Sequence, residues 1–271
     1  MFARSLTMIL PFVVCFGISE TCASQVRPWP PIVNQPSPEP VAAAVAPRGG
    51  RSDPPPISRN DKRLIQPDAA DVTRFRDLLS KPGHGIAKLL NSPCSNDQNG
   101  TYVIDASENC TNSLPGNGSH FSFRTGEHSL PEFSDLKIKN GRFIGGSIMT
   151  QGLIVALKEA GLSEVDFSCD EMKYLADFHP ADSVDGAQKQ TALINRGMWN
   201  DGHFYSGSTE IKENQIYALR SIAYRLKGEI PDKRRDIIVA FQVVRQDDDG
   251  NVTLIWKELQ NKESPKLYQD K

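Results

Sequence analysis

The residues best suited to chemistry are a histidine between two aspartates, His179 between Asp177 and Asp182. In a hydrolase, His179 would act as a general base and one aspartate would orient its ring. Pro180 favours a turn in the same segment, so both carboxylates could instead cap the helix that follows. No Gly-x-Ser-x-Gly elbow supplies a nucleophile, and the structural role is therefore the favoured interpretation.

A second chemical cluster occupies residues 199–205. Trp199 and Tyr205 could stack on a sugar or a peptide, while His203 and its neighbouring amide and carboxylate groups bind polar edges. The alternative is a loop whose aromatic residues pack back onto the core. Trp199, His203 and Tyr205 are candidates for binding rather than for catalysis.

We expect no metal and no cofactor. His84, His120 and His128 match neither a Cys-x-x-Cys pair nor a His-Glu-x-x-His motif. The segment 247–251 has the composition of a calcium loop but lacks its ligand spacing and distal glutamate. A hairpin turn accounts for that segment.

Residues 1–23 have the pattern of a cleavable signal peptide. Arg4 supplies a positive charge, residues 7–18 are almost wholly apolar, and small residues lead up to Ala23. The apolar run is shorter than the roughly 20 residues that span a bilayer. The sequence therefore predicts export, to the periplasm or outside the cell, and a mature chain with no transmembrane segment.

Residues 24–67 are predicted to be a disordered linker. Eleven prolines fall in this stretch, and proline fixes φ and removes a backbone donor. The linker carries a net charge of +3, whereas the whole chain carries -2. The mildly acidic remainder argues against a nucleic acid, whose phosphates need clustered lysine and arginine. The expected partner is an envelope component or another exported protein.

A long loop at residues 91–119 contains Cys94 and Cys110. A disulfide between them persists in an oxidising compartment and would stabilise the domain by about 3 kcal/mol. Cys169 is then left over. It could be a buried thiol or a site of intermolecular pairing.

Apolar spacing predicts helices in two parts of residues 68–271. Val72, Phe75, Leu78 and Leu79 share one helical face, capped by Asp68 or Asp71. A short helical turn is expected at 86–90. A helix over 184–198 has Asp182 or Asp185 as its cap and Gly197 as its terminator. Residues 172–178 could be either strand or helix.

The remaining pattern predicts strands. Asn140-Gly141 indicates a hairpin turn, and strands are expected at 142–149, 153–157 and 216–224. The clearest hairpin joins 237–243 to 252–256 around the turn at 247–251. These elements predict a single α+β domain over 68–271, with a frayed tail at 260–271. Its core is a mainly antiparallel, strongly bent sheet covered by two or three helices.

The strand region resembles an uncharacterised family of exported bacterial proteins. The resemblance covers roughly residues 70–265 and is carried by the segments 140–143, 219–224, 232–241, 243–245 and 254–259. It implies an exported, single-domain bacterial protein. It supplies no activity, cofactor or catalytic residue.

Two functions are compatible with these patterns. The first is an exported, non-enzymatic binding or envelope-associated module. The alternative is an extracytoplasmic hydrolase that uses Asp177, His179 or Asp182 on envelope or environmental polymers. The sequence favours the first because it carries no catalytic motif.

Overall fold

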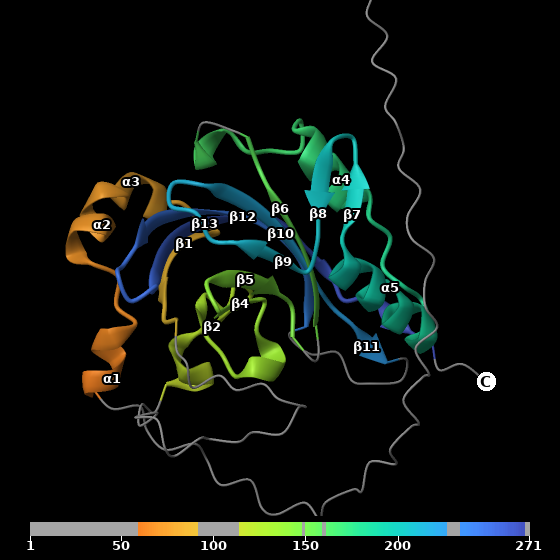
Figure 1. Cartoon of the computed structure of the whole chain (residues 1–271), viewed down its shortest axis with the longest axis horizontal. Coiled ribbons are helices and arrows are strands. Elements are labelled where there is room, and N and C mark those ends of the chain that lie inside the picture. The colour runs from red at the N-terminus through yellow and green to blue at the C-terminus, as the bar shows by residue number, and fades with distance from the viewer. Residues whose placement is uncertain (1–58, 92–113, 148–149, 159–160, 227–233, 269–271) are drawn as a thin grey trace, which may run out of the picture. The chain divides into compact units, whose positions relative to one another are not determined.

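In the computed structural model, the described residues are 59–91, 114–147, 150–158, 161–226 and 234–268 (Figure 1). The predicted signal peptide, most of the predicted linker, and Cys94 and Cys110 lie outside these ranges. The described part is rich in antiparallel sheet and has few helices. None of its helices is long and apolar enough to cross a membrane.

The main sheet has five antiparallel strands in the order β1–β13–β12–β10–β6. Its two longest strands form the predicted C-terminal hairpin, which is confirmed, and both are longer than their apolar alternation suggested. The strands are β1 (His84–Leu89), β6 (Thr150–Ala156), β10 (Ile216–Ala223), β12 (Arg235–Gln246) and β13 (Val252–Glu263).

A second antiparallel sheet has the order β3–β2–β4–β5–β9. The predicted turn at Asn140 and Gly141 joins β4 to β5, and both residues have positive φ, 51° and 68°. The expected strand at 142–149 corresponds to β5 of this sheet, whereas the one expected at 153–157 corresponds to β6 of the main sheet. The two expected strands therefore belong to different sheets. The strands are β2 (His120–Ser122), β3 (Glu127–His128), β4 (Leu136–Lys139), β5 (Arg142–Gly145) and β9 (Ser208–Glu210).

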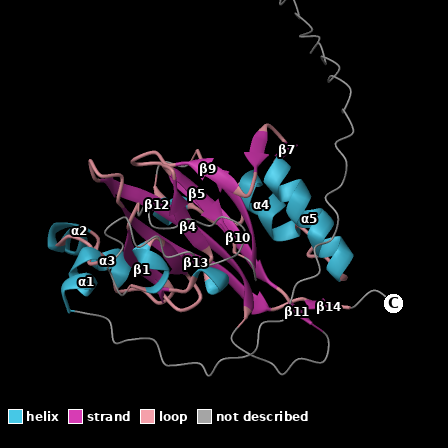
Figure 2. Cartoon of the chain, turned by 60° about the horizontal axis from the view of Figure 1, so that its bottom comes forward, coloured by secondary structure: helices cyan, strands magenta, loops and turns pink. Residues whose placement is uncertain are grey.

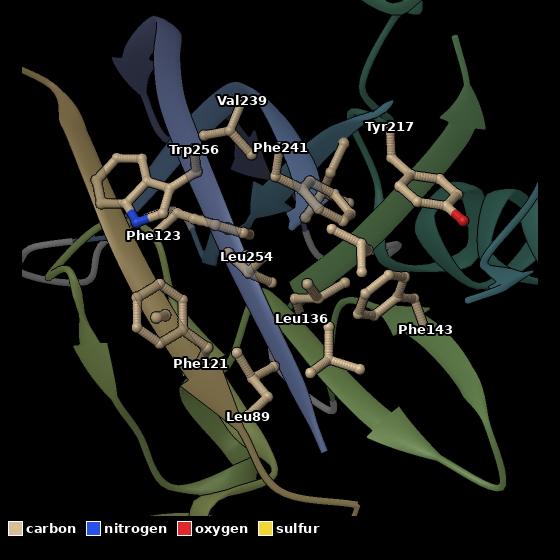
Figure 3. Packing of buried hydrophobic residues seen from close by; sticks show 14 of the residues in the cluster. Leu89, Phe121, Phe123, Leu136, Phe143, Tyr217, Val239, Phe241, Leu254 and Trp256 are labelled. Atoms are coloured by element: carbon tan, nitrogen blue, oxygen red, sulfur yellow. The ribbon is translucent and has the colours of Figure 1, made fainter. Parts of the chain in front are cut away.

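The two sheets enclose one apolar core (Figure 3). Side chains alternate along β10, so Tyr217 and Leu219 face the second sheet. Phe143 packs edge to face on Phe241, with ring centroids 5.2 Å apart. Figure 3 shows Trp256 and Phe121 at the β1 end of this core.

The other face of the main sheet packs against helices (Figures 1 and 2). Met172 and Leu175 of α4 (Asp170–Asp177) and Ile194 of α5 (Val184–Arg196) are buried there. The ambiguous segment 172–178 is thus helical up to Asp177, and Phe178 follows the helix with extended backbone. Because both faces of the main sheet are covered, the middle of its central strand β12 is apolar at consecutive positions, from Ile237 to Phe241.

The caps of α5 differ in part from the prediction. Ser183, rather than Asp182 or Asp185, caps the N-terminus by accepting a 3.1 Å hydrogen bond from the Gly186 N–H. Ser183 precedes the first helical residue, which is the position from which a side chain reaches the free N–H groups. Gly197 ends the helix as predicted, with φ 85°.

Helical structure begins before Asp68, the expected start of the domain. The helix α1 (Arg59–Leu64) lies inside the predicted linker, where residues 57–66 contain no proline and therefore keep their backbone donors. Asp68 caps α2 (Ala69–Arg74) as predicted, accepting from the Ala70 N–H at 2.8 Å. The predicted helix continues after a break at Phe75 as α3 (Arg76–Leu79).

Two local predictions are wrong. The expected helical turn at 86–90 is the strand β1, because pairing with β13 overrides the local apolar spacing. The tail expected to fray from residue 260 instead carries the end of β13 and the short strand β14 (Lys266–Leu267). That strand pairs in parallel with β11 (Arg225–Leu226).

A buried polar network joins the second sheet to β10. Asp135 is fully buried and pairs with the Arg124 guanidinium. It also accepts hydrogen bonds from the hydroxyls of Ser221 (2.6 Å) and Ser122 (3.1 Å). Burial raises the pKa of the Asp135 carboxyl, and the Arg124 charge opposes that rise. Each polar group in this network has a partner, as burial requires.

We expect Gly152→Ala to destabilise the fold by about 3 kcal/mol or more. A Cβ at Gly152 would lie 2.2 Å from the Gly145 carbonyl carbon, where β5 crosses β6. Gly161→Ala is the matched control, because its Cβ would meet no atom closer than 3.7 Å. Urea unfolding of both variants measures the difference, and equal stabilities would contradict this close approach.

His128 makes stability depend on pH. Burial lowers the pKa of its imidazole, although backbone groups of His120 and Lys88 partly offset the effect. An unfolded histidine titrates near about 6.5. The native chain therefore binds this proton less readily, and the free energy of unfolding falls as the pH drops below about 6.5 toward the lower native pKa.

We expect His128→Gln to lose less stability than the wild type between about pH 7.5 and about pH 5. The exposed His179 offers a matched control, and His179→Ala should keep the wild-type dependence on pH. Urea unfolding at both pH values measures this. Parallel losses in the wild type and His128→Gln would remove His128 as the cause.

Candidate binding site

Residues 198–205 form a two-stranded hairpin, here called the aromatic hairpin. Its strands are β7 (Met198–Asn200) and β8 (His203–Tyr205), paired antiparallel with Trp199 opposite Phe204. Asp201 and Gly202 make the turn with φ of 47° and 79°, as a two-residue hairpin loop requires. The predicted cluster is thus a regular hairpin rather than an irregular loop.

One face of the aromatic hairpin is buried. Tyr205 is fully buried, packs on Tyr174 with ring centroids 4.3 Å apart and ring planes tilted by 46°, and donates to the Glu171 carbonyl oxygen at 3.4 Å. Burial raises the pKa of the Tyr205 hydroxyl. Tyr205 therefore anchors the hairpin and is not available to stack on a ligand.

His203 lies on the same inward face. Its Nδ1 is 3.0 Å from the Glu171 Oε1, and the two side chains are 14% and 7% exposed. Glu171 belongs to the first turn of α4. This contact joins the turn of the hairpin to the start of the helix, so His203 has a positioning role.

The outward face carries the two exposed rings. Trp199 is 74% exposed and Phe204 is 44% exposed, and their ring centroids are 5.2 Å apart. Phe204 lies over Gly197, where a Cβ would come within 2.2 Å of its ring. At the turn of the hairpin, Asn200 donates to the Asp201 carboxylate at 3.0 Å. Of the two aromatic residues that the sequence proposed for contact, Trp199 faces outward and Tyr205 faces inward.

The Asp177–His179–Asp182 cluster lies at the other end of α4. All three side chains are exposed, and no hydrogen bond or ion pair joins them in the described part of the chain. Backbone groups hold the segment: the His179 carbonyl accepts from Gln190 at 2.7 Å, and the Asp182 carbonyl accepts from the Tyr268 N–H at 2.8 Å.

Arg220 fixes the end of α4 beside this cluster. Its guanidinium donates to the carbonyls of Leu175 (2.7 Å), Ala176 (3.2 Å) and Phe178 (2.5 Å). It also pairs with Asp236 through two hydrogen bonds of 2.9 and 2.6 Å. A cationic donor at the C-terminus of a helix satisfies the free carbonyl groups there and interacts favourably with the negative end of the helix dipole. The turn that follows α4 is therefore held in place by Arg220.

The helix keeps the two predicted clusters apart. Glu171 and His203 meet at its start, whereas His179 follows its end, about 10 Å away at 1.5 Å per residue. Among the described residues, no three histidine, cysteine, aspartate or glutamate side chains come together as a metal site. Cys169 precedes α4, where it is half-buried against the apolar cluster on the helix side.

Sequence reasoning missed Glu171 and Phe204. Glu171 lies 32 positions before His203, and nothing in its local pattern distinguishes it from an ordinary acidic residue in a first helical turn. Phe204 could have been found. With Asp201-Gly202 as the turn, period-2 alternation places Trp199 and Phe204 on one face and His203 and Tyr205 on the other.

We expect His203→Ala to lower the free energy of unfolding by about 1–3 kcal/mol, because the buried Glu171 carboxylate loses its partner. The exposed Asp185–Lys189 pair of α5 provides the control, and Asp185→Asn should cost less than about 0.5 kcal/mol. Urea unfolding measures both. Equal costs would show that the His203 contact does not hold the hairpin.

Comparison with known proteins gives no match from which the site could be interpreted, so its geometry is the basis for the interpretation. No family model, no curated protein and no solved structure matches the chain.

Proposed function

We propose that this chain is an exported, non-enzymatic binding module whose contact surface is the aromatic hairpin. The observation that carries the proposal is Trp199, which is 74% exposed although the opposite face of its hairpin is firmly anchored. Trp is normally highly buried. A rigid support beneath an exposed indole reduces the entropy lost on binding.

The ligand chemistry follows from the outward face. The adjoining rings of Trp199 and Phe204 offer an apolar surface, and the exposed Asp201 offers a carboxylate at the turn of the hairpin. This combination suits a saccharide or a peptide, which has an apolar face and polar edges. The proposed partner is an envelope component or another exported protein.

The remaining parts of the proposal concern location and architecture. Residues 1–23 would direct export, and the proline-rich residues 24–67 would act as a disordered tether of about 3.1 Å per residue. A disulfide between Cys94 and Cys110 and membership of the exported bacterial family remain part of the proposal. Register shifts at Ile238/Val239 and Val243/Arg245 support a strongly bent main sheet.

A hydrolase is less well supported. The side chains proposed for it, those of Asp177, His179 and Asp182, are exposed. The hydrogen bonds of this segment, such as that from Gln190 to the His179 carbonyl, are made by its backbone groups. The helix α4 also separates them from the aromatic hairpin that would present a substrate. The binding proposal needs only the exposed rings.

We expect Trp199→Ala to weaken binding to isolated envelope polysaccharide or exported protein by about 30-fold or more, as for a central aromatic contact. Co-sedimentation with the envelope fraction and titration of its purified components measure the affinity. Phe133→Ala is the matched control, because Phe133 is 50% exposed on a different element. Unfolding midpoints should be unchanged in both variants.

Two results would contradict the proposal. Equal binding by the wild type and Trp199→Ala would remove the aromatic hairpin as the contact surface. Release of soluble products from the bound polymer, abolished by His179→Ala, would show that the module is an enzyme.

A further inference from the structure

The outer edge of β1 is paired only in part. The Glu258 N–H donates to the Gly83 carbonyl at 2.7 Å, so odd-numbered residues of β1 point their backbone groups toward β13. His84, Ile86 and Lys88 then point theirs away from the sheet. Toward the far end, the Leu90 N–H donates outward to the Gly118 carbonyl at 2.9 Å, which follows the same alternation.

His84 and Ile86 form the open part of this edge. No backbone group in the described ranges pairs with their N–H or C=O groups. The opposite edge of the main sheet is different, because Ile154 of β6 exchanges hydrogen bonds of 2.8 and 3.0 Å with Ser206. Unpaired strand edges readily accept another strand.

A groove of about 400 Å³ runs along the open edge. Residues 83–86 form one wall, residues 123–126 form the other, and Trp256 lies between them. A Cβ at Gly85 would come within 2.6 Å of the indole, and one at Gly126 would lie 3.8 Å from it. On the side of the two glycines the ring is therefore covered by backbone alone, and Figure 3 shows its nitrogen over the β1 ribbon.

The floor of the groove holds an unsatisfied donor. The Trp256 side chain is more than nine-tenths buried, and its Nε1 has no hydrogen-bond partner among the described residues. A buried donor without an acceptor costs about 1–3 kcal/mol. The nitrogen lies under the Gly85 backbone, so pairing of a ligand strand with β1 would change its surroundings directly.

The charges around the groove favour a basic ligand. Glu258 lines one wall, and the exposed Glu127 directly follows the other. The only cation among the lining residues is Arg124, whose guanidinium is directed to the buried Asp135. Electrostatic complementarity therefore selects for lysine or arginine in the partner.

We propose that the β1 groove binds an extended, basic peptide segment of another protein by strand addition. Two N–H and two C=O groups, repeating about 7 Å apart at His84 and Ile86, match the backbone of a peptide strand. The peptide backbone pairs with His84 and Ile86, and its basic side chains contact Glu258 and Glu127. This site is separate from the aromatic hairpin and does not depend on its function.

The test uses the whole exported chain and a synthetic peptide of about ten residues that alternates valine with lysine. NMR titration should shift the Trp256 indole resonance and slow amide exchange at His84 and Ile86. A peptide N-methylated at alternate residues lacks the donors needed for pairing and should bind at least about tenfold more weakly. Trp199→Ala should leave this binding unchanged.

Charge variants test the choice of partner. The double variant Glu127→Lys/Glu258→Lys should weaken binding of the lysine peptide about tenfold, whereas Glu213→Lys, an exposed site on another loop, should not. Equal binding of the N-methylated peptide would overturn strand addition. Unchanged affinity in the double variant would overturn a basic partner. Protection of His84 and Ile86 that grows with protein concentration alone would instead identify a second copy as the occupant.

Discussion

The position of the candidate binding site depends on one buried cation. Arg220 lies on β10 of the main sheet, with its side chain 4% exposed, and it pairs with Asp236 on the neighbouring strand β12. The same guanidinium binds three carbonyls at the end of α4. Removing one partner of such a pair leaves an uncompensated charge in the core. The pair therefore fixes the position of α4 on the sheet.

The aromatic hairpin takes its position from α4. Glu171 and Tyr174 of this helix hold His203 and Tyr205 on the inward face of the hairpin. Trp199 and Phe204 are then left facing outward. The exposed rings are thus the end of a continuous set of contacts that begins at Arg220, and their orientation does not depend on a mobile loop.

Burial of both faces of the main sheet leaves its margins for binding. The central strands β10 and β12 are covered by the second sheet on one side and by helices on the other (Figures 1 and 2). The two contact surfaces that we propose, the aromatic hairpin and the open edge of β1, therefore lie outside the covered faces of this sheet. One offers exposed rings and the other offers unpaired backbone groups, so they suit chemically different ligands.

The sequence by itself determined the elements whose signals are local. Asn140-Gly141 and the turn at 247–251 specified two hairpins, and Gly197 specified the end of α5, because backbone conformation at these positions depends on nearby residues. Tertiary structure decided the rest. It made β1 a strand, placed β5 and β6 in different sheets, and brought Glu171 to His203. Contacts between residues distant in sequence leave no periodic signal, so neither the hairpin's buried face nor the groove beside Trp256 could be derived from spacing alone.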